Sequence, residues 1–442
     1  MKLKHLALAG LAAGLGAASL GTASAPALAQ NEQFIPQLVY RTGPFSPNGV
    51  PVANGILDYY TLINERDGGI NGVKILVEEC EFGYATDRGV ECYERLKAKG
   101  PTGAAFFHPF STGVTFALTE KTTTDKIPLL TIGYGRADSQ NGGVFQWNFP
   151  MMGTYWSSGD VAIQHIGKKE GGLDKLKGKK ITLVYHDSPA GKESIPVLQK
   201  RAAMHGFEFN VLPVTHPGIE QKATWLQIRQ ARPDWILLWG WGVMNSTAIK
   251  EAVAVGFPRE KMLGWWWSGA EPDVKPAEDG AKGFSSLAMQ HSAGRFKLHE
   301  DLKKHVFDKA KTQGKWEDSG DVLYNRGLLT AMLGIEGIRK AQEKFGKKPL
   351  KGEEVRWGLE NLELNEARIK ELGFEGVIGP IKLSCADHEG TSRARIHSWD
   401  GKEWKISSDW YEGDKSIVAP LVKEISAKYA EEKKITPVAD CK

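Results

Sequence analysis

Residues 104–113 read AAFFHPFSTG, an uninterrupted apolar run followed by a loop that ends in Ser, Thr and Gly. We predict a buried strand at 104–107, because short apolar runs bounded by turn residues are typical of strands covered on both faces. The loop 108–113 leads into a helix-like segment. An apolar strand followed by a loop and a helix is the repeating unit of α/β proteins with parallel sheets.

The same succession recurs along most of the chain. Further strands are predicted at 37–40, 73–77, 128–132, 180–185, 235–239 and 262–265, with helices at about 54–64 and 87–98. Helix-length connections between apolar strands indicate parallel sheets. Ligands of open parallel sheets lie beyond the carboxyl ends of the strands, so the loops after the strands are where a site is expected.

The N-terminus has the pattern of a cleaved secretory signal, predicted at residues 1–29. Lys2 and Lys4 precede an apolar stretch, and Ala27-Leu28-Ala29 fits a small-residue cleavage site. The apolar stretch is too short for a membrane anchor, and no cysteine follows the cut to carry a lipid. We therefore expect a periplasmic protein of 413 residues (442 − 29), enough for two α/β lobes.

The charge pattern argues against nucleic acid as a partner. Removing the predicted signal lowers the net charge from +4 to +2, because it contains two lysines and no acid. Basic and acidic residues are interleaved throughout the rest of the sequence. Binding to phosphate backbones requires clustered basic residues, which this chain does not have.

Four cysteines, Cys80, Cys92, Cys385 and Cys441, remain after cleavage. An even number in an exported chain indicates disulfides, and the sequence alone allows three pairings. Cys80 ends a strand-like run and Cys92 lies in the next helix-like segment, so this local pair is plausible, and it would leave Cys385 to hold Cys441. Free buried thiols are the alternative. The spacings of zinc sites are absent, and no metal is expected.

Three loops at the predicted carboxyl edge carry residues suited to a ligand: 41–46, 108–113 and 133–136. Hydroxyl groups and free backbone N–H groups at a helix start suit an anion such as a carboxylate. Ordinary capping and turn chemistry is the alternative for any single loop. Three such loops at one edge favour a site, and its candidate residues are Phe45, Ser111, Thr112, Gly133, Tyr134 and Gly135.

Half of the tryptophans, seven of fourteen, lie between Trp225 and Trp267. Packing between sheet and helices is the better interpretation for Trp225 and Trp235. Others fall at the ends of predicted strands, where an aromatic face can stack on a ligand. These candidates are Trp241, Trp265, Trp266 and Trp267.

Several segments, in this order, resemble the periplasmic leucine/isoleucine/valine-binding family, the type I solute-binding proteins of ABC importers. They are TGPF (42–45), NERDGGING (64–72), 106–113, 127–135, FEGVIGP (374–380), Asp387-His388 and WDG (399–401). The resemblance implies two Rossmann-like lobes with parallel sheets joined by three crossover segments. Lobe one would comprise 30–150 plus 285–374, and lobe two 151–284 plus 375–442.

The resemblance also implies a ligand held between lobes that close on a hinge. The loops at Ser111-Thr112 and 133–135 would hold its carboxylate. Relatives that bind amino acids usually carry a tyrosine in the loop after the first strand of lobe two, which here reads DSPAG (187–191). They also place an acid near the position of Trp265–Trp267. A buried ammonium without a counter-charge is costly, unless Glu271 or Asp273 reaches in.

The sequence therefore favours an aromatic or apolar carboxylic acid as ligand, delivered to permease subunits in the inner membrane. Binding of a branched-chain amino acid or an amide is the alternative, and a ligand-sensing module that docks on a receptor is an alternative of another class. The motifs G-x-S-x-G, H-E-x-x-H and the P-loop are absent, so no enzyme and no cofactor are expected. We expect a monomer.

Overall fold

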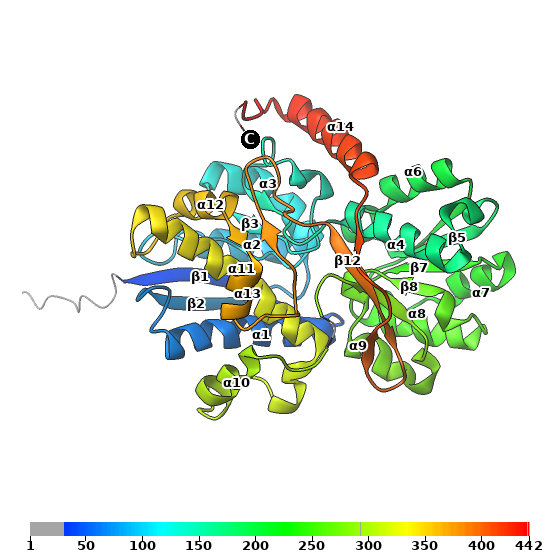
Figure 1. Ribbon diagram of the computed structural model, residues 1–442, viewed down its shortest axis with the longest axis horizontal. Helices are drawn as coiled ribbons and strands as arrows, with labels where there is room; N and C mark the ends of the chain where they lie inside the picture. The colour runs from blue at the N-terminus through cyan, green and yellow to red at the C-terminus, as the bar shows by residue number, and fades with distance from the viewer. Residues whose placement is uncertain (1–30, 292, 440, 442) are drawn as a thin grey trace, which may run out of the picture.

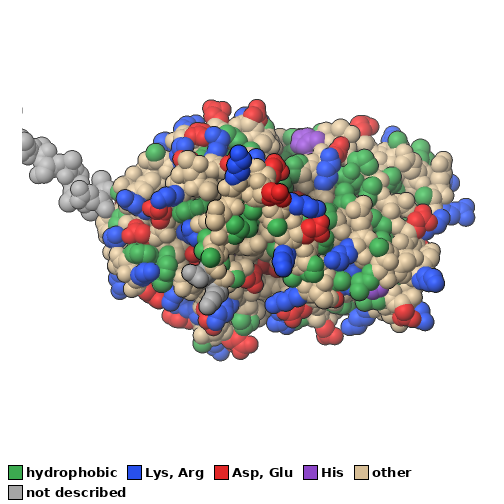
Figure 2. Space-filling model, turned by 90° about the horizontal axis from the view of Figure 1, so that it is seen from above, with side chains coloured by type: hydrophobic (Ala, Val, Ile, Leu, Met, Phe, Trp, Pro, Cys, Tyr) green, Lys and Arg blue, Asp and Glu red, His purple; other side chains and the backbone are tan. Residues whose placement is uncertain are grey.

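The computed structural model describes residues 31–291, 293–439 and 441, and the predicted signal peptide at 1–29 lies outside them. The described chain forms two lobes side by side (Figure 1). None of its described helices is both long and apolar enough to cross a bilayer. Figure 2 shows acidic and basic side chains interspersed over the face in view.

Lobe one is built around two parallel strands, β1 and β2, with short strand pairs beside them. Its elements are β1 (Glu32–Val39), α1 (Ser46–Arg66), β2 (Lys74–Glu81), α2 (Thr86–Leu96), α3 (Thr112–Asp125), β3 (Leu129–Leu130), β4 (Asn148–Phe149), α10 (Leu298–Leu302), α11 (Val322–Phe345), α12 (Gly352–Glu360), β10 (Glu363–Leu364), α13 (Glu366–Glu371) and β11 (Ile381–Lys382). The predicted strand at 104–107 contributes only an isolated bridge, from Phe107 to Leu129. The sequence predicted this buried apolar run, but it did not predict that the run lacks the regular pairing of a strand.

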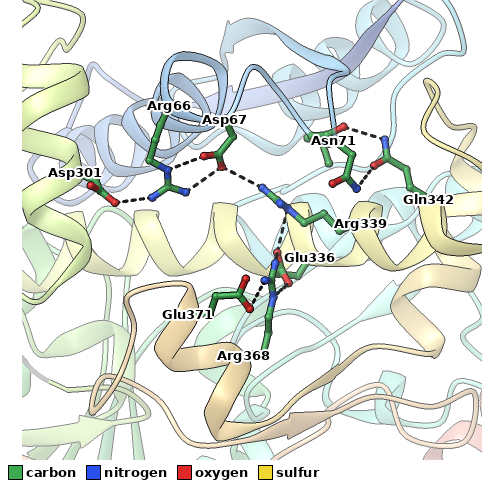
Figure 3. A network of polar contacts seen from close by, with 10 residues as sticks. Arg66, Asp67, Asn71, Asp301, Glu336, Arg339, Gln342, Arg368 and Glu371 are labelled. Carbon is green, nitrogen blue, oxygen red and sulfur yellow. Dashed lines mark hydrogen bonds and ion pairs between the residues drawn. The ribbon is translucent and has the colours of Figure 1, made fainter.

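Close packing of α1 against α11 depends on two glycines. A Cβ atom at Gly55 would lie 2.2 Å from the carbonyl oxygen of Tyr324, and one at Gly327 would lie 2.3 Å from that of Val52. Any side chain at either position would therefore force the helices apart. A network of ion pairs continues this contact at the surface, where Arg66 and Arg339 share Asp67, and Glu336 joins Arg339 to Arg368 (Figure 3).

Lobe two contains the largest sheet, in the order β13-β12-β9-β8-β7-β5-β6 with β14 on β12. Its elements are α4 (Tyr155–Glu170), β5 (Lys180–His186), α5 (Pro189–Lys192), α6 (Ile195–His205), β6 (Glu208–Val214), α7 (Lys222–Ala231), β7 (Trp235–Trp239), α8 (Val243–Ala254), β8 (Met262–Gly264), α9 (Glu271–Val274), β9 (Ser285–Ala288), β12 (Arg393–Trp399), β13 (Trp404–Ile406) and β14 (Tyr411–Glu412). Strands β5, β7 and β8 lie where the sequence predicted them. Edge strand β6 was missed, because half-exposed positions replace the continuous apolar run.

The predicted α/β fold class is confirmed, and the chain crosses between the lobes three times. The first crossing follows β4, near the predicted position at 150. The second comes later than predicted, because β9 (Ser285–Ala288) still pairs with β8 of lobe two. The third also comes later, between Glu389 and β12, whereas the sequence placed it near Phe374. Phe374 packs on Tyr59 of lobe one, and β11 pairs with β10 there.

The last helix, α14 (Lys415–Lys433), lies across both lobes at the top of Figure 1. At its start, the backbone N–H of Asp414 donates to Asp160 of α4 over 2.8 Å. At its far end, Tyr429 stacks on Phe145 of lobe one, and the Cys385–Cys441 disulfide fixes the tail. The sequence assigned 375–442 to lobe two, but this segment contacts both lobes.

Both disulfides favoured by the sequence are formed, Cys80–Cys92 and Cys385–Cys441. Cys80 and Cys92 are 4% and 3% exposed and link β2 to α2 within the core of lobe one. Closing a loop of 12 residues stabilises a fold by about 3 kcal/mol in the chain-entropy treatment. The Cys80→Ala/Cys92→Ala protein should therefore show a clearly lower thermal unfolding midpoint in calorimetry. Equal midpoints, with the wild-type protein unaffected by a thiol reductant, would contradict this expectation.

Candidate functional site

A cavity lies between the lobes. It is lined by Tyr40, Tyr84, Phe110, Ser111, Thr112, Tyr134, Tyr155, Trp241, Trp265 and Trp267. The first six belong to lobe one and the last four to lobe two. Nine of these residues are at most 7% exposed, so the lobes are closed over the cavity.

The start of α3 supplies the polar end of the cavity. Ser111 is the N-cap of this helix, and its hydroxyl accepts a hydrogen bond from the N–H of Val114 over 3.4 Å. The Thr112 hydroxyl lies 3.0 Å from the Tyr155 hydroxyl of lobe two. The first N–H groups of a helix have no partner within it and carry a partial positive charge. This end of the cavity is therefore suited to an anionic or strongly polar group.

Tyrosine hydroxyls extend this polar end. Burial raises the pKa of Tyr40, Tyr134 and Tyr155 above its ordinary value, so these phenols stay protonated and neutral at physiological pH. The Tyr134 oxygen accepts a hydrogen bond from the N–H of Phe110 over 2.7 Å, which fixes the ring against its own lobe. The Tyr134 hydroxyl also donates to the carbonyl oxygen of Leu130 over 3.5 Å. The hydroxyls of Tyr40 and Tyr155 can donate to a ligand without adding negative charge to the site.

Tryptophans of lobe two form the opposite wall. Trp265 stacks on Tyr155 with ring centroids 4.5 Å apart, and its indole N–H donates to the carbonyl oxygen of Gly240. Trp241 and Trp267 meet edge to face at 5.3 Å. The buried indole nitrogens of Trp241 and Trp267 have no hydrogen-bond partner in the described structure. This wall offers aromatic faces together with two free N–H donors.

No charged side chain is among the described residues that line the cavity. The two acids considered as counter-charges, Glu271 and Asp273, are engaged elsewhere between the lobes. Glu271 accepts from the N–H of Val322, and Asp273 accepts from the amides of Asn48 and Asn245. Burial raises the pKa of Glu271 to about 7 and that of Asp273 to about 6. Neither carboxylate reaches the ligand space.

Of the predicted ligand-binding residues, Ser111, Thr112, Tyr134, Trp241, Trp265 and Trp267 line the cavity, and four do not. Phe45 lies between the lobes with its ring 4.9 Å from that of His216. The backbone N–H of Gly135 donates to the Thr112 hydroxyl, and Gly135 itself does not line the cavity. A Cβ atom at Gly133 would lie 2.3 Å from the ring of Trp266, so these two residues form one of the contacts between the closed lobes.

Trp266 is fully buried behind the wall that Trp265 and Trp267 form. The guanidinium carbon of Arg326, on α11 of lobe one, lies 4.8 Å from the Trp266 ring centroid and 5.3 Å from that of Trp267. Cation–π contacts of this kind stabilise closed lobes when both groups are shielded from water. Trp266 therefore supports closure and has no direct access to the ligand.

Sequence reasoning did not select Tyr40, Tyr84, Phe110 or Tyr155 as ligand-binding residues. Tyr40 directly follows β1, and Phe110 lies in a loop already selected, so position after a strand was an available signal for both. Tyr84 lies three residues after the end of β2, so the same signal applied to it, whereas Tyr155 is the first residue of α4, where no local pattern marks it. Arg136, whose role was open, forms an ion pair of 2.7 Å with Asp138 and does not line the cavity.

Two lobes with a cavity closed between them are the architecture of a solute-binding protein. The chain matches the periplasmic binding protein family over residues 32–403, and it belongs to that family. The resemblance to type I solute-binding proteins is thereby confirmed, and the family is non-enzymatic. A comparison with curated proteins found no match.

Solved structures agree with this assignment. A protein described as an ABC transporter permease from the Pseudomonas fluorescens group is 42% identical, with 93% of this chain and 99% of that chain covered and a TM-score of 0.86. A branched-chain amino acid ABC transporter from Thermus thermophilus with bound valine is 21% identical, with 89% and 99% covered and a TM-score of 0.73. A solute-binding protein from Rhodopseudomonas palustris BisB5 with 3,4-dihydroxybenzoic acid is 15% identical, with 87% and 98% covered and a TM-score of 0.67. The last two show the fold alone.

Proposed function

We propose that this substrate-binding protein captures an aromatic or apolar carboxylic acid in the periplasm and delivers it to the permease of its ABC transporter. The observation that carries the proposal is a closed cavity lined by aromatic rings and hydroxyls, with no charged side chain among its described lining residues. The periplasmic location rests on the family and on the predicted signal at 1–29. A monomeric state stays a prediction.

The carboxylate would lie at the start of α3. Ser111 and Thr112 lie at this helix terminus, and Tyr155 reaches it from lobe two with a protonated hydroxyl. Backbone N–H groups at a helix start and neutral hydroxyl donors can stabilise an anion without a cationic side chain. The carboxylate would thus be held by contacts from both lobes, which couples its binding to closure.

The body of the ligand would lie against Trp241 and Trp267. These rings stand edge to face, and Tyr134 meets Trp267 at 5.9 Å from lobe one. An aromatic ring in a corner of this kind gains stacking and edge contacts of about 0.5–1.5 kcal/mol each beyond the area it buries. The ligand of the Rhodopseudomonas palustris relative, 3,4-dihydroxybenzoic acid, has this chemistry.

A branched-chain amino acid is the second candidate, because the Thermus thermophilus relative holds valine. Its ammonium group would need an anionic partner once it is buried. Glu271 and Asp273 already accept hydrogen bonds from backbone and amide groups outside the cavity. This arrangement favours an acid without an ammonium group.

Calorimetric titration of the unliganded mature protein tests the proposal. We expect benzoate or a hydroxybenzoate to bind with a dissociation constant at least about tenfold lower than that of leucine, isoleucine or valine, a difference of about 1.4 kcal/mol. Small-angle scattering should show the protein becoming more compact with the same ligand. Tight binding of the branched-chain amino acids with no response to aromatic acids would contradict the proposal.

A further inference from the structure

A second groove lies at the hinge outside the ligand cavity. Arg393, Arg395 and Trp410 line it on the side of lobe two, and the segment 376–380 lines it on the side of lobe one. Glu366 is the one acid among its described lining residues. The groove thus combines two cations and one aromatic ring at the third crossing of the chain.

The fold holds the two arginines together. Arg393 and Arg395 are two positions apart on β12, so they share one face of the strand. Trp410 precedes β14, whose Tyr411 pairs with Ala394 of β12. The guanidinium carbons of Arg395 and Arg393 lie 4.4 and 5.3 Å from the centroid of the Trp410 ring. One indole therefore positions both planar cations.

No carboxylate of the described residues offsets the positive charge of this pair. In the described part of the chain neither guanidinium group forms an ion pair, and the buried Nε of Arg395 has no hydrogen-bond partner. Burial lowers the pKa of Arg395, as expected where no anion offsets the lost hydration. By contrast, Arg41 and Arg201 contact carboxylates at 2.7 and 2.6 Å.

The opposite wall leaves room beside these groups. A Cβ atom at Gly379 would lie 3.7 Å from Nη1 of Arg393, and one at Gly376 would meet no atom within 4 Å. Because glycine has no side chain, the oxygens of a ligand can approach the guanidinium group closely from this side. Arg393 and Gly376 are exposed, so the groove is open to solvent and an anion can enter it.

We propose that this hinge groove is a second ligand site, which binds a small oxyanion carrying two charges, such as inorganic phosphate or a short dicarboxylate. Guanidinium groups present paired N–H donors that match the oxygens of phosphate and carboxylate. Because walls from both lobes form the groove, a bound anion stabilises the closed arrangement. By thermodynamic reciprocity, it raises affinity at the interlobe cavity by the same factor as a cavity ligand raises anion affinity.

The experiment is a calorimetric titration of the mature protein with inorganic phosphate and, separately, with succinate, in a chloride buffer of low ionic strength. We expect saturable binding of at least one anion at one site per chain. The Arg393→Gln/Arg395→Gln protein should bind it at least about tenfold more weakly, since both charge-assisted contacts are removed. Arg88→Gln, which changes an exposed arginine on α2, is the control and should bind as the wild type does.

Absence of saturable binding for both anions, or equal affinities in the double variant and the wild type, would overturn the proposal. Binding of a hexaglutamate peptide, with no binding of phosphate or succinate, would also overturn it and indicate a partner protein with an acidic segment. These titrations contain no cavity ligand. Their failure would therefore leave the proposed function of the interlobe cavity untouched.

Discussion

Binding of an aromatic carboxylate is expected to weaken by about tenfold to hundredfold when Trp241 is replaced by alanine. The indole lines the cavity, and it contacts Trp267 of its own lobe and Tyr40 of lobe one with centroids at 5.3 and 6.4 Å. Its loss removes stacking on the ligand and buried apolar area, together about 1.4–2.7 kcal/mol. Calorimetry at one temperature measures the difference directly.

Two further variants distinguish loss of the ligand contact of Trp241 from general destabilisation of the protein. Trp241→Phe keeps an aromatic face and should recover most of the affinity. Trp357→Ala removes a half-buried tryptophan of α12 in lobe one, outside the cavity lining, and should leave affinity unchanged. An unchanged dissociation constant in Trp241→Ala would exclude this ring from the ligand contact.

Gly133→Ala should weaken ligand binding by about tenfold to hundredfold through a different mechanism, a block on closure. The added Cβ would lie 2.3 Å from the Trp266 ring of the facing lobe. Overpacking of this kind costs about 1–3 kcal/mol in the closed form alone, because the open lobes relieve it. Small-angle scattering should show a radius of gyration that contracts less at saturating ligand than in the wild type.

Gly72→Ala is the matched control. Gly133 and Gly72 both have a positive φ, +68° and +89°, so each substitution carries the same kind of backbone strain. A Cβ at Gly72 meets no atom within 4 Å. If both variants lose affinity equally, backbone strain in lobe one is the cause and the closure contact is not.

Local patterns in the sequence predicted much of the fold. The apolar runs at 180–185 and 235–239 became the central strands β5 and β7 because buried parallel strands need uninterrupted apolar residues. Pairing of Cys80 with Cys92 was predictable because they lie only 12 positions apart, one at the end of a strand and one in the next helix. The site loops were found by the rule that ligands lie after the strands, and that rule brought Ser111, Thr112 and Trp241 onto one cavity.

By itself, then, the sequence determined the fold class, the carboxyl edge where the cavity lies and the aromatic character of its wall. Only the tertiary structure decided that Tyr155 lines the cavity, that Gly133 and Trp266 meet across the cleft, and that Glu271 and Asp273 are withdrawn from it. Hydrophobic periodicity is a property of neighbouring residues, and it fixes strands and helices. Contacts across the cleft depend on how two separately folded lobes close, and residues far apart in the chain carry no local signal of that geometry.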